Sequence, residues 1–282
     1  MWERGQLKER AKSVLKGSYW KAFLVSIVMG MVSGGSSFNA GGAANADSFD
    51  TLFNNPDELF WILIIAGIIV VMALIIGTAI KVFVGYHLEV GGSRYFMQAA
   101  QGDIDVGYLG YTFQNGRYVS VIKAMFWRNL IIALWSLLTI IPILILLLSY
   151  IINPYPMMEP WKIIATTFFT LLFGIPAAIK KYAYIIVPYL LADNPNIGSN
   201  RALQLSNQMT QGHKFRIYIL QLSFIGWYLL GMLGCIVGII FVVPYERATE
   251  AELYLVLRQE AIEKGLCDYQ ELNLIKQVKE IE

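Results

Sequence analysis

Five long runs of apolar residues dominate the chain, with shorter polar stretches between them. The runs occupy residues 20–38, 59–86, 124–152, 161–191 and 217–243. A helix needs about 20 apolar residues to cross the hydrocarbon core of a bilayer, and these runs reach or approach that length. They are too long for strands, and they lack the alternation of a spanning β-barrel. The pattern therefore predicts an all-α fold, a polytopic bundle of membrane helices.

Basic residues alternate between the two sides of these runs. Five Lys or Arg residues precede the first run in 1–19, whereas 39–58 has none. Three fall in 87–123, none in 153–160 and three in 192–216. Basic residues are retained on the cytoplasmic side of a membrane, so this alternation predicts a multi-pass protein with a cytoplasmic N-terminus.

The last run leaves the number of crossings open between five and six. As one straight helix, 27 residues would extend about 40 Å, more than one crossing needs. Glycines recur within it, and a tight turn near 231–234 would let the chain cross again, down to about residue 254. One crossing leaves the C-terminus outside, and two return it to the cytoplasm. The pattern favours six transmembrane helices.

The stretches outside the runs belong to one integral membrane domain, residues 1–282. Residues 1–19 predict a basic amphipathic helix, which either sets the topology or lies on the anionic leaflet. A secretory signal peptide is the rival interpretation of the first run. The glycine-rich segment 87–123 predicts short interfacial helices and turns, and 255–282 predicts a soluble helical tail.

Composition narrows the classes of function. Hydrophobic residues make up 56% of the chain and charged residues only 15%, which excludes a disordered chain, a nucleic-acid-binding protein and a small disulfide scaffold. The two cysteines and the two histidines, His87 and His213, fit no metal-ligand spacing. Motifs for nucleotide binding and for serine hydrolysis are also missing, so we expect no cofactor, no metal and no enzymatic activity.

Ionisable residues within or beside the runs are the candidate polar or lipid-facing sites. They are Lys81, Arg128, Lys180, Lys181, Glu246, Arg247 and Glu250. A charge in hydrocarbon is costly, which makes such residues functional candidates by default. The lysines and Arg128 lie near predicted inner ends and can extend to the interface. The last three could line a polar cavity if a sixth crossing exists.

Small residues predict where helices pack closely. Ser26, Gly30 and Gly34 follow a four-residue spacing in the first run, and Gly234 and Gly238 do so in the last. Small side chains let helix backbones approach each other within a membrane. We expect these positions to pack the bundle, with a subunit or partner interface as the alternative.

Three segments together resemble a known family. They are 7–23, 192–218 and 222–257, and their most specific part is 222–227 followed by Pro244-Tyr245 and Thr249. The chain resembles the "domain of unknown function 975" family of bacterial integral membrane proteins, although Leu253-Tyr254 stands where Phe-Tyr is expected. The resemblance implies a multi-pass protein of the bacterial plasma membrane and favours an even number of crossings. It implies no activity and no residue roles.

These observations favour a non-enzymatic membrane protein that acts through protein or lipid contacts, such as an accessory, envelope-stress or peptide-immunity factor. We expect membrane lipids as partners, together with a membrane-protein partner or a second copy, and no nucleic acid. The alternative is a transporter or lipid-handling protein, which would use the helices interrupted by Pro142, Pro176 and Pro188.

The basic N-terminus should determine the orientation of the chain. Replacing Lys8, Arg10, Lys12 and Lys16 with glutamine should weaken or scramble insertion with the N-terminus inside, because the charge bias is lost. Reporter fusions at the N-terminus and in 39–58 measure this. An unchanged topology would show that these charges do not set the orientation.

Overall fold

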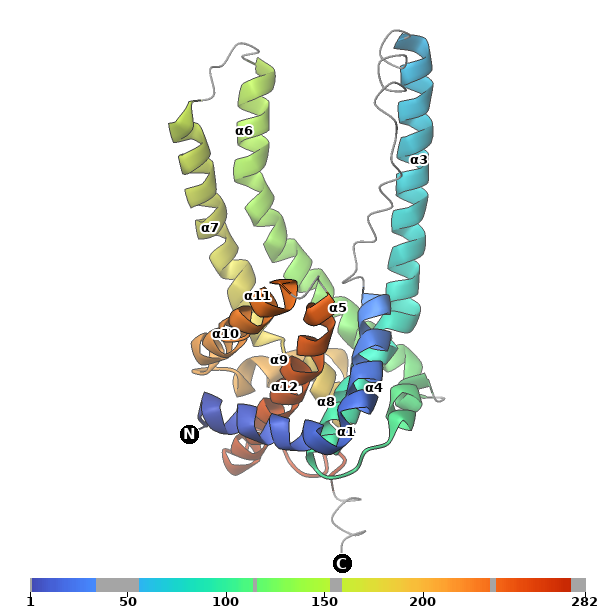
Figure 1. Cartoon of the computed structure of the whole chain (residues 1–282), viewed down its shortest axis with the longest axis vertical. Coiled ribbons are helices and arrows are strands. Elements are labelled where there is room, and N and C mark those ends of the chain that lie inside the picture. The colour runs from blue at the N-terminus through green and yellow to red at the C-terminus, as the bar shows by residue number, and fades with distance from the viewer. Residues whose placement is uncertain (1, 34–55, 114–115, 153–158, 234–236, 275–282) are drawn as a thin grey trace, which may run out of the picture.

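The structure, a computed structural model, describes residues 2–33, 56–113, 116–152, 159–233 and 237–274. These residues form helices joined by turns and loops, and they contain no strand. The all-α prediction is confirmed. The fold has two parts (Figure 1): a packed body, which contains the N-terminus, and three long helices, α3, α6 and α7, that rise from it. We call the end of the body away from these helices the base.

The rising helices are α3 (Pro56–Ile80), α6 (Ile141–Ile152) and α7 (Pro160–Ala183). The body is built from α1 (Arg4–Ser33), α4 (Tyr86–Ala100), α5 (Tyr118–Leu137), α8 (Val187–Asp193), α9 (Ser199–Met209), α10 (Lys214–Leu222), α11 (Ile225–Leu233) and α12 (Val237–Glu263). Short helical turns connect them: η1 (Lys81–Gly85), η2 (Val106–Phe113) and η3 (Leu138–Ile140).

Four helical stretches in the described residues are long and apolar enough to cross a membrane, by length and composition alone. They are Phe60–Ala100, Tyr118–Ile152, Pro160–Asp193 and Lys214–Met232. They overlap the last four predicted runs. The first run, 20–38, is not among them, and its residues 34–38 lie outside the described part.

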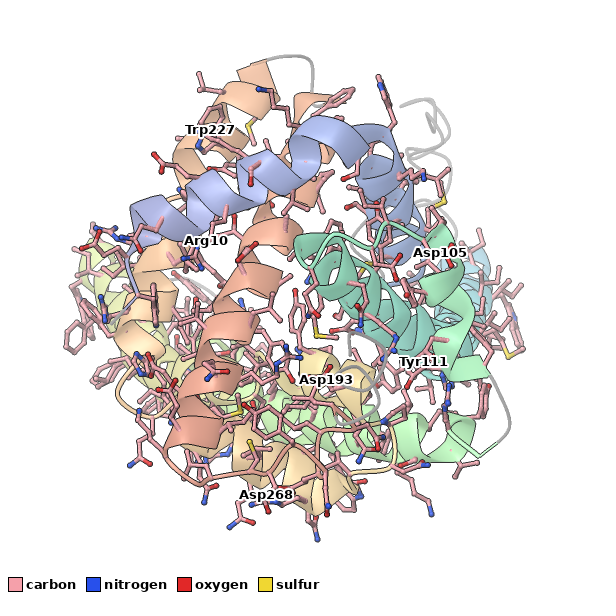
Figure 2. The ribbon with its side chains drawn as sticks, turned by 90° about the horizontal axis from the view of Figure 1, so that it is seen from below. Arg10, Asp105, Tyr111, Asp193, Trp227 and Asp268 are labelled. Carbon is pink, nitrogen blue, oxygen red and sulfur yellow. The ribbon has the colours of Figure 1, made fainter. Side chains whose placement is uncertain are left out.

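The N-terminal segment is a packed element of the body. Residues 4–19, predicted as a basic amphipathic helix, are the first half of the single helix α1. This half lies across the base (Figure 2), and α1 packs along α12. Leu7, Ala11 and Leu15, spaced four residues apart, are buried in the core. The apolar stripe therefore covers protein, and the charged residues Arg10, Lys12 and Lys16 face outward.

The segment 87–123 differs most from its prediction. Instead of short interfacial helices throughout, it begins with α4, which continues directly from α3 and η1 and is almost wholly buried. Two glycines make this burial feasible. A Cβ at Gly91 would lie 2.4 Å from the Leu109 carbonyl oxygen in η2, and one at Gly92 would lie 2.0 Å from Sδ of Met29 in α1. The glycines thus serve close packing rather than turns.

The last predicted run is not one straight helix. It is divided among α10, α11 and the start of α12, and α11 packs against α12 as a helical hairpin. The hairpin closes where Gly231 meets Gly238: a Cβ at Gly238 would lie 2.6 Å from the Gly231 Cα atom. In Figure 1 the hairpin ends well below the tops of α3, α6 and α7.

The other predicted packing residues have varied surroundings. Ser26 is buried, whereas a Cβ at Gly30 would meet nothing within 4 Å. Gly34 and Gly234 lie outside the described residues. Gly238 makes its close contact with Gly231, which the four-residue spacing did not include.

The predicted tail begins inside α12, which continues to Glu263. Arg201 of α9 then holds the following segment, because its Nε and Nη2 donate to the two carboxylate oxygens of Glu271 at 2.6 and 3.0 Å. Its Nη2 also donates to the Leu266 carbonyl at 2.7 Å. The Arg201 hydrogen bond lowers the pKa of Glu271, so this carboxylate stays ionised at neutral pH. Residues 275–282 lie outside the described part.

The α11–α12 hairpin should tolerate no side chain at its glycine contact. We expect Gly231→Ala to lower the free energy of unfolding by about 1–3 kcal/mol, because the new methyl group meets backbone atoms of Gly238 at 2.8 Å. The matched control is Gly226→Ala in the same hairpin, where the methyl group enters open space. Denaturant titration in detergent measures both; equal stability of the two variants would contradict the close contact.

Candidate functional site

One face of α12 carries polar side chains at every fourth position. They are Glu246, Glu250, Tyr254 and Arg258. Residues four apart lie above one another on a helix, so these side chains form a line along α12. We call this set the polar ladder. It faces α8, α10 and α11, whose own polar side chains meet it.

The basal part of the ladder surrounds a buried carboxylate. The side chain of Asp193, at the end of α8, is only 1% exposed. It accepts a hydrogen bond of 3.0 Å from Nη1 of Arg258 and one of 2.5 Å from the Tyr254 hydroxyl. The label of Asp193 in Figure 2 marks this place among the helices.

A second arginine secures the end of α8 from the other side. Arg94 of α4 donates from Nη1 to the carbonyl of Ala192. Its guanidinium lies 3.8 Å from the ring centre of Tyr111 and 5.5 Å from that of Tyr108, both in η2. A cation at a helix C-terminus satisfies an unpaired carbonyl, and the aromatic faces stabilise its charge. Two helices, α4 and α12, thus converge on the two residues that end α8.

The upper part of the ladder joins α12 to α8, α10 and α11. Glu250 accepts hydrogen bonds from Nε2 of Gln221 at 3.0 Å and from Nη1 of Arg247 at 3.2 Å. The Tyr189 hydroxyl donates to the same carboxylate at 3.5 Å. Tyr228 of α11 donates to Glu246. Glu246, Arg247 and Glu250, which were expected to line a polar cavity if a sixth crossing exists, are engaged with one another and with neighbouring helices.

Tyr189 connects the two parts of the ladder. Its ring stacks on that of Tyr254, with the ring centres 5.4 Å apart. Tyr189 and Asp193 are four residues apart on α8, as Glu250 and Tyr254 are on α12. Two helices therefore present matching polar faces, and the contacts run without a break from Glu250 to Arg258.

Arg128 does not extend to water in the way that its position suggested. It forms an ion pair of 2.8 Å with Glu89 of α4, and the two side chains are 14% and 18% exposed. Its Nε also donates to the Tyr184 carbonyl at 3.1 Å, between α7 and α8. Arg128 therefore joins α5 to α4 and to the end of α7.

The three candidate lysines lie away from the ladder contacts. Lys81 is exposed at the start of η1. Nζ of Lys180 lies 5.6 Å from the Trp135 ring centre, and Nζ of Lys181 lies 5.7 Å from that of Tyr182. These positions fit amphipathic side chains that rest on aromatic rings.

Sequence reasoning did not single out most of the partners in these contacts, among them Glu89, Asp193, Tyr254 and Arg258. The spacing of four along α12 could have revealed Tyr254 and Arg258. Asp193 precedes Asn194-Pro195, a pair typical of a turn, and nothing in the sequence connects Asp193 to a residue 65 positions later.

The polar ladder and its partners can hold the helices together, because each charged side chain of the ladder contacts a partner in the protein. Among the described residues, no group of three or more His, Cys, Asp or Glu side chains could hold a metal ion. Buried ion pairs with full hydrogen bonding fix an arrangement of helices more than they add net stability.

A family model described as "Protein of unknown function (DUF975)" matches residues 1–261. This confirms the resemblance drawn from the three sequence segments. No curated protein and no solved structure matches the chain.

The Asp193 carboxylate should become strongly destabilising when its arginine is removed. We expect Arg258→Met to lower the free energy of unfolding by about 3–5 kcal/mol, because a buried charge loses its counterion. Adding Asp193→Asn to that variant should restore part of the loss.

Denaturant titration of the detergent-solubilised protein, followed by circular dichroism, measures both variants. The control is Lys264→Met, which removes a cation that pairs with Glu260 at 3.4 Å on the surface and should change the free energy of unfolding by less than about 1 kcal/mol. An Arg258→Met variant as stable as this control would refute the role of the buried pair.

Proposed function

Because the chain belongs to the DUF975 family, whose description gives no activity, we propose a function from the geometry. We propose that it is a non-enzymatic, multi-pass protein of the bacterial plasma membrane that acts through contacts within the membrane, as an accessory, envelope-stress or peptide-immunity factor. Its partner in this proposal is another membrane protein or a second copy, bound by the rising helices.

The exposure of α3 carries this proposal. Every residue from Phe60 to Thr78 is exposed, on all faces of the helix. The helix then continues through η1 into α4, where nearly every side chain is buried. A membrane helix of a self-contained bundle packs one face against its neighbours. Helix α3 instead stands apart from α6 and α7 (Figure 1), which leaves all its faces to lipid or to a partner.

The pair α6–α7 forms a second arm with a different surface. The two helices pack on each other and enclose a groove of about 420 Å³. Its lining is mainly apolar, with Trp161, Phe169 and Phe173 on one side and Pro142 on the other. This groove suits an apolar side chain or an acyl chain, and so supports a role in contacts inside the bilayer.

Two observations support an even number of crossings, as in the six-helix arrangement that we propose. The α11–α12 hairpin returns the chain toward the base. Trp2, near the N-terminus, and Glu260, toward the C-terminus, both contact His213 there. The Trp2 and His213 ring centres lie 6.2 Å apart, and His213 Nε2 lies 3.3 Å from a carboxylate oxygen of Glu260. In this proposal the base is the cytoplasmic side, as the alternation of basic residues indicates.

The polar ladder favours the alternative of a transporter or lipid-handling protein. Its side chains form a continuous line from the α11–α12 hairpin to the base, as a polar pathway would. Against this, each charged side chain in the ladder already has a protein partner. The contact function is therefore the proposal that the geometry supports best.

A photo-crosslinking scan of α3 tests the contact function. A benzophenone amino acid is placed at each position from Ile62 to Met72, one at a time, in the full-length protein in native membranes. We expect adducts with a protein at positions three or four apart, because a partner covers one face of a helix. Positions on the opposite face of the same helix serve as matched controls.

Lipid adducts at all positions, without periodicity and without a protein adduct, would contradict the proposal. The alternative function, a transporter or lipid-handling protein, is tested by measuring the movement of solutes or lipids across the membrane of proteoliposomes. If such movement occurs and is abolished by Glu250→Gln, the transporter replaces the contact function.

A further inference from the structure

A basic groove lies where the start of α1 meets α10. It has a volume of about 730 Å³ and is apart from the polar ladder. Three of its lining side chains are cationic, namely Arg4, Lys8 and Arg216, and one, Glu3, is acidic. Gly5 leaves space beside them, since a Cβ there would meet nothing within 4 Å. The groove is therefore open and carries an excess of positive charge.

None of the three cations forms an ion pair with a residue in the described part of the chain. Lys8 donates from Nζ to the Ser223 carbonyl at 3.4 Å and lies 4.3 Å from the Phe224 ring centre. Glu3, the groove's one carboxylate, instead accepts a long hydrogen bond of 3.5 Å from Gln6. Burial and the neighbouring charges of Arg4 and Lys12 lower the pKa of Lys8, as expected where cations gather without a counterion.

Arg216 is fixed in position but has an unused donor. Its Nη2 donates to the Trp2 carbonyl at 2.8 Å, and its guanidinium lies 4.8 Å from the Trp2 ring centre. Its Nη1 is buried from solvent and has no hydrogen-bond partner among the described residues. A buried donor on a charged group is costly when unpaired.

The first turn of α1 adds further donors to the same groove. The earliest backbone hydrogen bond there runs from the Leu7 amide to the Glu3 carbonyl, at 3.2 Å. The amides of Arg4 and Gly5, which both line the groove, precede that bond and are not used inside the helix. The N-terminus of a helix also carries partial positive charge, and both features favour an anion.

The other side of the groove is apolar and leads toward the membrane. Phe215 and Ile219 of α10 line it, and the Phe215 side chain is 72% exposed. These residues begin the candidate membrane span Lys214–Met232. The groove therefore joins a cationic pocket to an apolar surface at the polar end of a span, which is the level of lipid headgroups.

We infer that this groove binds the phosphate headgroup of an anionic phospholipid. Arg4, Lys8 and Arg216 contact the phosphate, and the acyl chains lie along Phe215 and Ile219. The inference goes beyond the proposed function and does not depend on α3 having a protein partner.

Native mass spectrometry of the full-length protein in mild detergent tests this site. Phosphatidylglycerol and phosphatidylcholine with the same acyl chains are added in equal amounts. We expect the protein to retain phosphatidylglycerol about tenfold better, because basic residues at the interface each add attraction to an anionic lipid. The triple variant Arg4→Gln, Lys8→Gln and Arg216→Gln should lose this preference.

Two further variants distinguish loss of the groove from a general loss of positive charge and from unfolding. The charge-matched control, Lys12→Gln, Lys16→Gln and Lys264→Gln, removes as many cations outside the groove and should retain the lipid. Gly5→Trp fills the groove without a change of charge, favours the helix more than glycine does, and should abolish the preference.

Equal loss in the charge-matched control, or full retention by Gly5→Trp, would overturn the inference. So would equal retention of the two lipids by the unmodified protein. The last measurement tests inorganic phosphate. If inorganic phosphate binds the groove and phosphatidylglycerol does not, the ligand is a soluble phosphate, and the lipid inference is wrong.

Discussion

The buried carboxylate of Asp193 is the constraint on which the body depends. Two arginines from different helices reach the end of α8, where Arg258 neutralises Asp193 and Arg94 binds the Ala192 carbonyl. The Tyr254 hydroxyl uses a further lone pair of the carboxylate. A charge buried this deeply is tolerated only in the one arrangement that supplies all its partners. It therefore selects a single packing of α4, α8 and α12, and the long helices rise from elements that this packing holds in place.

The body and the rising helices differ in how much of their surface is buried within the protein. The body pairs the charges of its polar ladder internally and buries large side chains such as Tyr95, Phe224 and Tyr254. Helix α3 and the pair α6–α7 bury little, because their apolar surfaces need no protein cover inside a bilayer. The junction is a continuous helix, from α3 through η1 into α4.

Much of the fold could be predicted from the sequence, because the length of an apolar run indicates whether a helix is long enough to cross a membrane. The four candidate spans, the all-helical class and the family were all within reach of pattern and resemblance. The buried face of α1 also followed from its four-residue period, but its partner did not, because an amphipathic helix fits lipid and protein equally well. The contacts of Asp193 with Arg258 and of Gly231 with Gly238 depend on three-dimensional packing. Local propensity assigns Asp193 to a turn, and no spacing rule links such pairs.

The charged side chains of this protein fall into two groups, those paired within the polar ladder and those without a counterion in the groove between α1 and α10. In the polar ladder, Glu250 and Arg258 meet partners on neighbouring helices, so their desolvation is already compensated. In the groove between α1 and α10, the cations have aromatic rings and carbonyls but no counterion within the described chain. Folding alone gives no reason to gather Arg4, Lys8 and Arg216 there, since like charges repel. An external anion in the groove resolves that repulsion. The groove, with its unpaired cations, is therefore better suited to an external ligand than the polar ladder, whose charges are already paired.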